Sequence, residues 1–328
     1  GKFDFTADYF KKTSADILAN LPINPTSGTN QAIPFNAATI ENEGFELSLT
    51  YNKREGNFKY SVTGGFSSLN NEVIDLGEGV NPIRGGGFTD ETFAATRTEA
   101  GFPVAYFYGY KTNGVYQSQA EIDADGLTGR TAVPGDLRFV DTNNDGVLDA
   151  TDQTLLGSPI PDFEYSLNFD SKYKQLDLTL FFQGVQGNEI WNGRLFEGVF
   201  GQNGNKRGIA RNAWTPQNGS NVPRASISDA GVNRRESDFY VEDGSYFRLR
   251  NITLGYTLPD KITDRAFFTK FRAYINVENA FSFIGPSIVF VVVEESVSSA
   301  CIRRSSISSS CPWNSNLPAL VILKEPLP

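Results

Sequence analysis

The chain has 328 residues, with no His, no Met and a net charge of −9. The absence of His excludes Ser-His-Asp and Cys-His catalytic systems and His-ligated zinc. The acidic charge excludes nucleic acid as a partner, because such binding depends on clustered Lys and Arg. Both cysteines, Cys301 and Cys311, lie near the end of the chain, so no disulfide framework supports its main body.

Alternating apolar and polar residues begin at once, in the stretch 3–9, where Phe3, Phe5 and Tyr9 alternate with acids and Thr. Because successive side chains of a strand point to opposite faces, this period predicts a half-buried strand. The same pattern predicts strands at 45–51, 163–169, 176–182 and 271–277, and we also expect strands at 58–66 and 245–258. Together with 13% aromatic residues, this indicates an all-β chain.

The connections between these strands fall into two classes. "NKREGN" (52–57) and "SKYKQ" (171–175) are short and predict hairpins 45–66 and 163–182. By contrast, 67–102, 111–160 and 185–244 are long and rich in Gly, Asn, Asp and Pro. Short turns at one end and long loops at the other are typical of an outer-membrane barrel, whose short turns are periplasmic. A soluble β-sandwich alternates in the same way, so periodicity alone leaves both architectures open.

If the short turns share one side, the chain between strands 58–66 and 163–169 must contain an even number of crossings, zero or two. The candidate loops at 141–152 and 185–244 then lie at the same outer mouth. In that arrangement the apolar residues of 163–169 and 176–182 face lipid, since a membrane strand needs an apolar outer face.

The stretch "DTNNDGVLDATD" (141–152) has the oxygen spacing of an EF-hand calcium loop, with Gly146 at the sharp turn. No flanking helices are predicted, so we expect a structural Ca²⁺ site on a loop and not a sensor. The alternative is an Asn/Asp/Gly-rich turn whose side chains bond only the backbone. The expected ligands are Asp141, Asn143, Asp145, Asp149 and Asp152, with the carbonyl of Val147.

Trp191, Asn192 and Trp214 lie in the long 185–244 connection and are candidate substrate contacts, because indole rings stack on sugars. Packing within the loop is the simpler interpretation. The acid pairs Asp123/Asp125 and Glu242/Asp243 do not predict a glycosidase, since sequence adjacency does not place two carboxylates across a glycosidic bond. No enzymatic activity is expected. Arg248 and Arg250, with Arg234 and Arg235, form a basic cluster that we expect to be ion-paired in a strand wall.

Four longer motifs carry a resemblance to a known family. "IENEGFELSLTYN" (40–52), "PGDLRFVDTNNDGVLDATDQTLLGSPIPDFEYSLNF" (134–169), "RNAWTPQNGSNVPRA" (211–225) and "RESDFYVEDGSYFRLRNITLGYTLP" (235–259) resemble the C-terminal barrel region of SusC/RagA-family TonB-dependent transporters of the Bacteroidota outer membrane. The resemblance implies that residues 1–285 are an incomplete C-terminal part of a 22-stranded antiparallel transmembrane β-barrel closed by an N-terminal plug. It further implies import of glycan oligosaccharides or peptides, energised by the TonB complex and assisted by a SusD-like surface lipoprotein.

The sequence begins with Gly and carries no signal peptide, which predicts an internal piece of a longer product. Residues 286–328 are Ser-rich and no longer resemble the family, so we expect an aberrant tail, frameshifted or disordered, that forms no barrel strand. The alternative for the chain as a whole is a secreted, calcium-stabilised β-rich adhesin or binding module.

Overall fold

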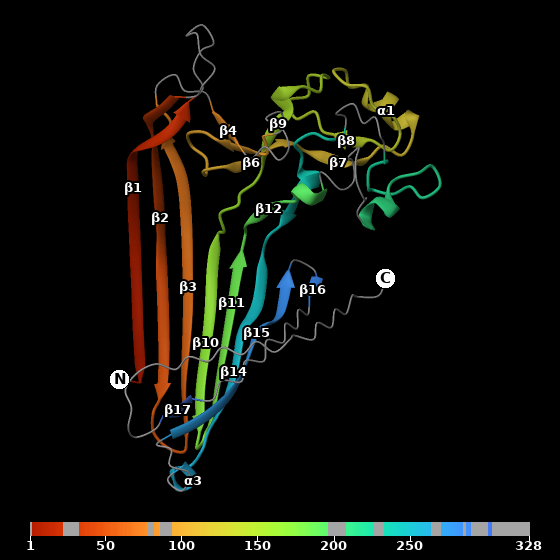
Figure 1. Cartoon of the computed structure of the whole chain (residues 1–328). Helices are drawn as coiled ribbons and strands as arrows, with labels where there is room; N and C mark the ends of the chain where they lie inside the picture. The colour runs from red at the N-terminus through yellow and green to blue at the C-terminus, as the bar shows by residue number, and fades with distance from the viewer. Residues whose placement is uncertain are drawn as a thin grey trace.

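One long antiparallel sheet dominates the molecule, and a group of smaller sheets gathers at one of its ends (Figure 1). The computed structural model describes residues 2–21, 33–77, 82–85, 94–195, 208–225, 233–263, 270–284, 287–289 and 301–303. Within these ranges, no helix has the length and apolar composition needed to cross a membrane.

The long sheet follows chain order but skips the intervening strands at two places, where β3 pairs with β10 and β11 pairs with β14. The whole segment between β3 and β10 therefore makes no crossing, which confirms one of the two predicted arrangements. The sheet ends in a short strand, β16 (Ser287–Val289), on the edge of β15. In order across the sheet, the long strands are β1 (Phe3–Leu21), β2 (Ile33–Lys53), β3 (Phe58–Asp75), β10 (Phe163–Tyr173), β11 (Leu176–Gln186), β14 (Tyr246–Thr257) and β15 (Lys270–Ile284).

Tight turns lie together at one end of the sheet, the lower end in Figure 1. β2 and β3 are joined by residues 54–57, and β10 and β11 by Lys174–Gln175, where Lys174 adopts φ 54°. The short helix α3 (Asp260–Thr263) lies at this end between β14 and β15. Both predicted hairpins are thus present, with strands longer than the periodicity indicated.

The described residues of 76–162 and 187–245 form the group of smaller sheets at the upper end, here called the loop layer. The helix α1 (Gln119–Asp125) is bounded by Ser118, whose hydroxyl accepts from the Glu121 amide, and by Gly126 in the left-handed conformation. The elements are β4 (Ile83–Gly85), β5 (Thr96–Thr98), β6 (Tyr106–Tyr110) and β9 (Gln153–Gly157) in one sheet; β7 (Thr112–Val115) with β8 (Leu137–Phe139); β12 (Glu189–Trp191) with β13 (Val241–Asp243); α1 (Gln119–Asp125); and the 3-10 turns η2 (Ala150–Asp152), η3 (Gly208–Asn212) and η4 (Asp238–Tyr240).

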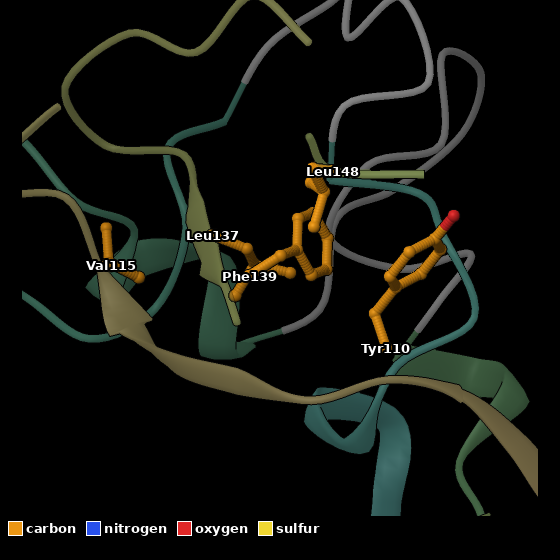
Figure 2. Packing of buried hydrophobic residues seen from close by; sticks show 5 residues of the cluster. All are labelled: Tyr110, Val115, Leu137, Phe139 and Leu148. Atoms are coloured by element: carbon orange, nitrogen blue, oxygen red, sulfur yellow. The ribbon is translucent and has the colours of Figure 1, made fainter. Parts of the chain in front are cut away.

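The largest buried cluster lies in the loop layer and not in the long sheet (Figure 2). Its members come from β6, β7, β8 and the loop before η2, and Leu137, Phe139 and Leu148 are at most 2% exposed. The full cluster is Tyr110, Val115, Leu137, Phe139 and Leu148, with Trp214 and Phe239 packed against it. The loop layer therefore folds around a conventional apolar core.

The tail after residue 285 is described at only two places. β16 pairs with the end of β15, and β17 (Cys301–Arg303) pairs with its beginning. Each has three residues, far below the ~9–11 that a membrane strand needs. The rest of 286–328 lies outside the described residues, and the predicted boundary at 285 stays a prediction.

Candidate functional site

The long sheet has one apolar and one polar face over its whole width. The pairing register places Phe169 of β10 between Val62 of β3 and Leu180 of β11, so the apolar residues of neighbouring strands share a face. Many side chains of the apolar face are largely uncovered: Phe5 is 67% exposed, Leu49 51% and Ile275 58%. A surface of this size and character is expected in a sheet whose apolar face meets lipid.

Aromatic rings form two rows on the apolar face, one toward each end of the strands. Such paired rows are the girdles that membrane barrels place at the two lipid–water interfaces, and the eleven residues of β10 match the span of a membrane strand. In the row nearer the loop layer, neighbouring ring centroids are 5.5–6.2 Å apart, and the rings are Phe45, Phe66, Phe163, Tyr165, Phe182, Phe247 and Phe283. The opposite row consists of Phe3, Tyr51, Phe58, Tyr60 and Phe169.

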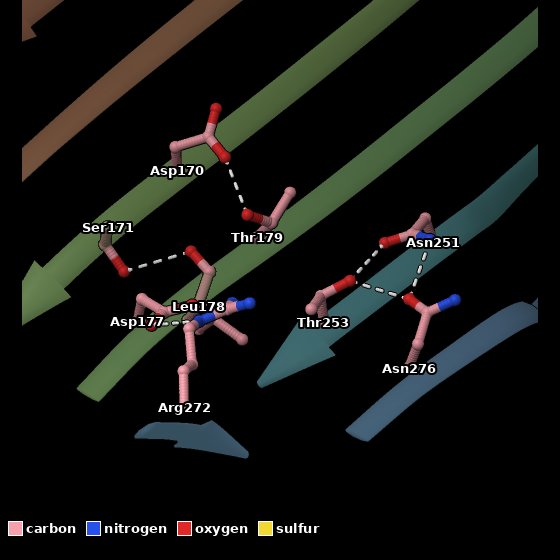
Figure 3. Close-up of polar contacts among 9 residues, drawn as sticks. All are labelled: Asp170, Ser171, Asp177, Leu178, Thr179, Asn251, Thr253, Arg272 and Asn276. Carbon is pink, nitrogen blue, oxygen red and sulfur yellow. Dashed lines mark hydrogen bonds and ion pairs between the residues drawn. The ribbon is translucent and has the colours of Figure 1, made fainter. Parts of the chain in front are cut away.

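The polar face is held together by hydrogen bonds that cross from strand to strand (Figure 3). The hydroxyl of Thr179 donates to Asp170 Oδ1 over 2.7 Å, and Arg272 of β15 pairs with Asp177 of β11. Asn276 Oδ1 accepts from the Asn251 amide over 2.8 Å. In a barrel this face lines the interior, where water and solute keep polar groups solvated.

In the loop layer, two of the sequence motifs, 134–169 and 211–225, meet at the buried carboxylate of Asp136. Asp136 is 1% exposed and follows Gly135, whose φ is +94°. Its Oδ1 accepts from Arg224 Nε at 2.6 Å and from Asn233 Nδ2 at 2.9 Å, and its Oδ2 accepts from the Val133 amide at 2.9 Å. The carboxylate is thus fully hydrogen-bonded, as a buried charge must be.

A second set of contacts fastens the 233–243 segment to β6 and β7. The carboxylate of Asp238 accepts from the backbone amide of Thr112 at 3.0 Å and from its hydroxyl at 2.6 Å. The Glu236 carbonyl accepts from the Tyr110 amide at 2.8 Å. Gly109 is required here, because a Cβ at this position would lie 2.3 Å from that carbonyl oxygen.

Asp125, at the end of α1, is paired with a cation and a phenol. Arg138 donates to both of its oxygens, at 2.8 and 2.6 Å, and the Tyr116 hydroxyl donates at 2.9 Å. Partial burial works to raise the pKa of Asp125, but the hydrogen bonds from Arg138 and Tyr116 outweigh it and lower that pKa. Burial, assisted by the bond to Asp125, raises the pKa of Tyr116 to about 12.

The 141–152 loop forms a compact set of side-chain-to-backbone hydrogen bonds. Asp141 accepts from the amides of Asn144 and Gly146, at 2.7 and 2.8 Å, and Asp145 accepts from the Val147 amide at 2.8 Å. Asp149 and Asp152 form a capping box around η2. Within the described part of the chain, no three acidic or Cys side chains are gathered closely enough to hold a metal. The calcium assignment stays a prediction.

The two tryptophans predicted as substrate contacts lie in different clusters. Trp191 packs against Tyr240, with ring centroids 5.4 Å apart, and Trp214 packs on the apolar core of Figure 2 and donates from its indole N–H to Gln117 at 2.9 Å. Asn192 donates to Glu242 Oε1 at 2.7 Å. The structure gives all three a packing or hydrogen-bonding role and leaves substrate contact untested.

The four arginines of the predicted basic cluster are separated. Arg234 and Arg235 belong to the loop layer, where the Arg235 guanidinium lies 5.6 Å from the centre of the Tyr110 ring. Arg248 and Arg250 lie on the polar face of β14 and both donate to Gln183 Oε1, at 3.3 and 3.2 Å. The ion pairs among the described residues include neither of them, contrary to the expected ion-paired wall.

Sequence reasoning did not single out Asp136, Asn233, Glu236 or Asp238 as residues that organise the loops. Their partners are far away in the chain: 88 residues separate Asp136 from Arg224, and 126 separate Thr112 from Asp238. The only available signal was that most of them lie in or beside the motifs that carry the family resemblance.

Comparison with known proteins agrees with the two-faced sheet. No protein-family model matches the sequence. TonB-dependent receptor P26 of Formosa agariphila is 38% identical over 256 residues, 76% of this chain. TonB-dependent receptor P3 of the same organism is 31% identical over 288 residues, 86% of this chain. TonB-dependent receptor SusC of Bacteroides thetaiotaomicron is 24% identical over 83% of it.

Solved structures show the same fold. A structure described as the RagAB peptide transporter superposes with a TM-score of 0.66 and 22% identity over 87% of this chain and 30% of that one. The RagAB peptide importer in its closed-closed state gives 0.65 and 21%, over 86% and 30% of the two chains.

The chain spans 25–28% of the length of receptors P26 and P3 of Formosa agariphila. With its apolar face, aromatic rows and strand order, the open sheet matches part of a TonB-dependent receptor barrel. It therefore corresponds to a C-terminal part of a SusC/RagA-family TonB-dependent receptor, a non-enzymatic protein of the outer membrane of Bacteroidota-type bacteria.

Proposed function

We propose that this segment is part of an importer that carries nutrients, glycan oligosaccharides or peptides, across the outer membrane with TonB energy and a SusD-like surface lipoprotein. The supporting observation is the construction of the loop layer. It is a packed, hydrogen-bonded body at one end of the membrane sheet (Figure 1). In the orientation we propose, that end is the outer mouth, where solute and a surface lipoprotein arrive. RagAB, the complex of the superposed structures, is described as a peptide importer.

Deletion of the full-length receptor tests this function. Cells lacking it should lose uptake of at least one class of labelled peptide or oligosaccharide and regain it on complementation, and the receptor should co-purify with a surface lipoprotein. Equal uptake by deletion and parent strains for both classes would argue against the importer.

The orientation has its own test. An epitope inserted at Gln217–Asn218, in an exposed turn of the loop layer, should bind antibody on intact cells expressing the full-length receptor. Labelling only after permeabilisation would place the loop layer in the periplasm and remove it from solute capture.

We further propose that the 141–152 loop binds Ca²⁺ weakly, at the level of ~10⁻⁴–10⁻³ M seen in extracellular modules. A carboxylate oxygen has two lone pairs, so those of Asp141 and Asp145 that accept amide hydrogens retain capacity for a cation. Calorimetric titration of the full-length receptor should show saturable heat that Asp145→Ala abolishes. Heat that persists in Asp145→Ala would remove these ligands.

A further inference from the structure

Two arginines near the loop-layer end of β14 have no carboxylate partner among the described residues. Arg248 is two residues from the start of the strand, and Gln183, which receives a hydrogen bond from each guanidinium, is three residues from the end of β11. Arg272, lower on the same polar face, is paired with Asp177 instead. The face therefore carries a neutralised cation toward one end and two unneutralised cations toward the other.

A β-bulge gathers polar groups at this point. On β14, Leu249 pairs with Phe182 and Asn251 with Phe181, so in the strand register no residue of β11 lies opposite Arg250. The register with β15 slips at the same place, where Asn279 adopts φ 52°. The extra residue puts the successive residues Arg250 and Asn251 both on the polar side, and bulges commonly re-aim side chains in this way beside functional sites.

These residues line a hollow of about 600 Å³ on the polar face. Its volume lies within the range of small-molecule sites. Its charged groups are two arginines and one glutamate, a net charge of +1, and the Nε of Arg248 is buried without a hydrogen-bond partner. The hollow is lined by Phe181, Arg248, Arg250, Asn251, Glu278 and Asn279.

The two guanidinium groups are held in place by a shared hydrogen-bond acceptor and by aromatic rings. Gln183 accepts one N–H from each, Arg248 lies 4.8 Å from the centre of the Tyr246 ring, and Arg250 lies 5.9 Å from that of Phe181. A guanidinium has five N–H donors in a planar fork, so most of them remain for a ligand. That fork matches the paired oxygens of a carboxylate, sulfate or phosphate group.

We propose that this hollow binds an oxyanionic group, a carboxylate or a sulfate or phosphate ester, on the solute that the receptor transports. The proposal rests on the proposed import function. The position supports a solute as the occupant, because the hollow begins two residues from the loop-layer end of β14, on the polar face that lines the interior of a barrel. An acidic side chain elsewhere in the receptor is the competing occupant.

Matched probes test the proposal in cells that express the full-length receptor. The probes are an N-blocked peptide with a free or an amidated C-terminus, and an oligosaccharide with or without a sulfate ester. Arg248→Gln/Arg250→Gln should lower uptake of the anionic member of a transported pair by about tenfold or more and spare the neutral member. Arg272→Gln, which removes a paired arginine from the same face, is the control and should leave the anionic preference unchanged.

Other results of this uptake experiment would contradict either the oxyanion site or the import function. Wild-type cells with no preference for the anionic form, or a double variant that keeps the wild-type preference, would overturn the oxyanion site. Loss of anionic and neutral uptake together, at normal surface levels of the receptor, would assign the arginines to a contact within the receptor. Wild-type uptake no higher than in a deletion strain would overturn the import function instead.

In that last case a binding measurement still decides the site. The purified full-length proteins are titrated with sodium sulfate and with sodium acetate at constant ionic strength. Saturable binding to wild type and Arg272→Gln but not to the double variant supports the site, and the salt that saturates identifies the preferred oxyanion. Glu278→Gln should tighten binding, since it removes the single negative charge of the hollow. Equal binding by wild type and double variant, or none by wild type, overturns the proposal.

Discussion

The long sheet and the loop layer bury opposite kinds of groups. In the sheet, large apolar side chains such as Phe5 and Leu49 stay uncovered while the backbone is paired from strand to strand. In the loop layer, apolar residues such as Leu137 are buried, and so is the charge of Asp136. The sheet thus relies on lipid to cover its apolar face, whereas the loop layer, which meets water, must build its own core.

Because the two regions bury different groups, different substitutions should destabilise each of them. A charge on the lipid-facing side of the sheet has no compensating partner, and a missing charge in the loop layer leaves partners unpaired. The two regions should therefore respond differently to the substitutions and the pH change described below.

Asp136→Ala should have the largest effect. It leaves Arg224 and Asn233 without the carboxylate that they share, and removal of one partner of a buried ion pair costs about 3–5 kcal/mol. Hydrogen–deuterium exchange of the full-length receptor should show the loss of protection in the loop layer and not in the strands. Asp123→Ala, an exposed acid of α1, is the control and should change local stability by less than about 0.5 kcal/mol. Equal effects of the two variants would contradict the buried network.

Leu180→Arg should destabilise the sheet by about 2–4 kcal/mol, the cost of a cation on the lipid face near the middle of the eleven-residue strand β11. Thr179→Arg, one residue along on the polar face, should cost much less because its charge stays in water. Urea titration of the refolded receptor in lipid vesicles measures both. A larger loss for Thr179→Arg would reverse the assignment of the two faces.

Gly109→Ala should cost about 1–3 kcal/mol, because the new methyl group would lie 2.3 Å from the Glu236 carbonyl oxygen. Gly64→Ala on β3 has no atom within 4 Å of the new Cβ and should be close to neutral. Thermal unfolding of the two variants side by side tests whether the loop layer is packed more tightly than the sheet.

The smallest effect is a pH dependence confined to the loop layer. Because the pKa of Asp125 is lowered in the folded state, its contribution is present above the ordinary carboxylate pKa of about 4 and is lost as the pH falls further. Tyr116 acts in the opposite direction, since its pKa is raised to about 12, and its contribution is lost as the pH rises from about 10 toward that value. The local stability of α1, measured by amide exchange, should fall at both the acid and the alkaline end of this pH range. Asp125→Asn should remove the fall at the acid end. An unchanged fall at the acid end in Asp125→Asn would contradict this assignment.

The two regions also differ in how far the sequence alone predicts them. Alternation assigned Phe163, Tyr165, Leu167 and Phe169 to one face, and the register confirms it because a strand between lipid and water must alternate. The alternation did not predict the parts of β1, β2 and β3 nearer the loop layer. These parts extend beyond the apolar band, so no contact with lipid requires every second residue to be apolar.

In the loop layer the sequence was less informative. β6 is buried at four of its five positions, so it shows no alternation. The role of Asp136 depends on partners 88 and 97 residues away, which no local pattern reveals. The motifs of the family resemblance marked the right segments without showing that they meet.

The direct pairing of β3 with β10, and of β11 with β14, has a consequence for how such receptors diverge. Each long insert leaves and re-enters the sheet at adjacent strands, about 4.8 Å apart, so recombination could replace it without shifting the strand register. Yet the Asp136–Arg224 pair and the Tyr110–Glu236 bond join one insert to the other. A recombinant that received only one of them would leave a buried charge facing a foreign surface. The two inserts should therefore be inherited as one unit, and grafts between relatives should work only when both are moved together.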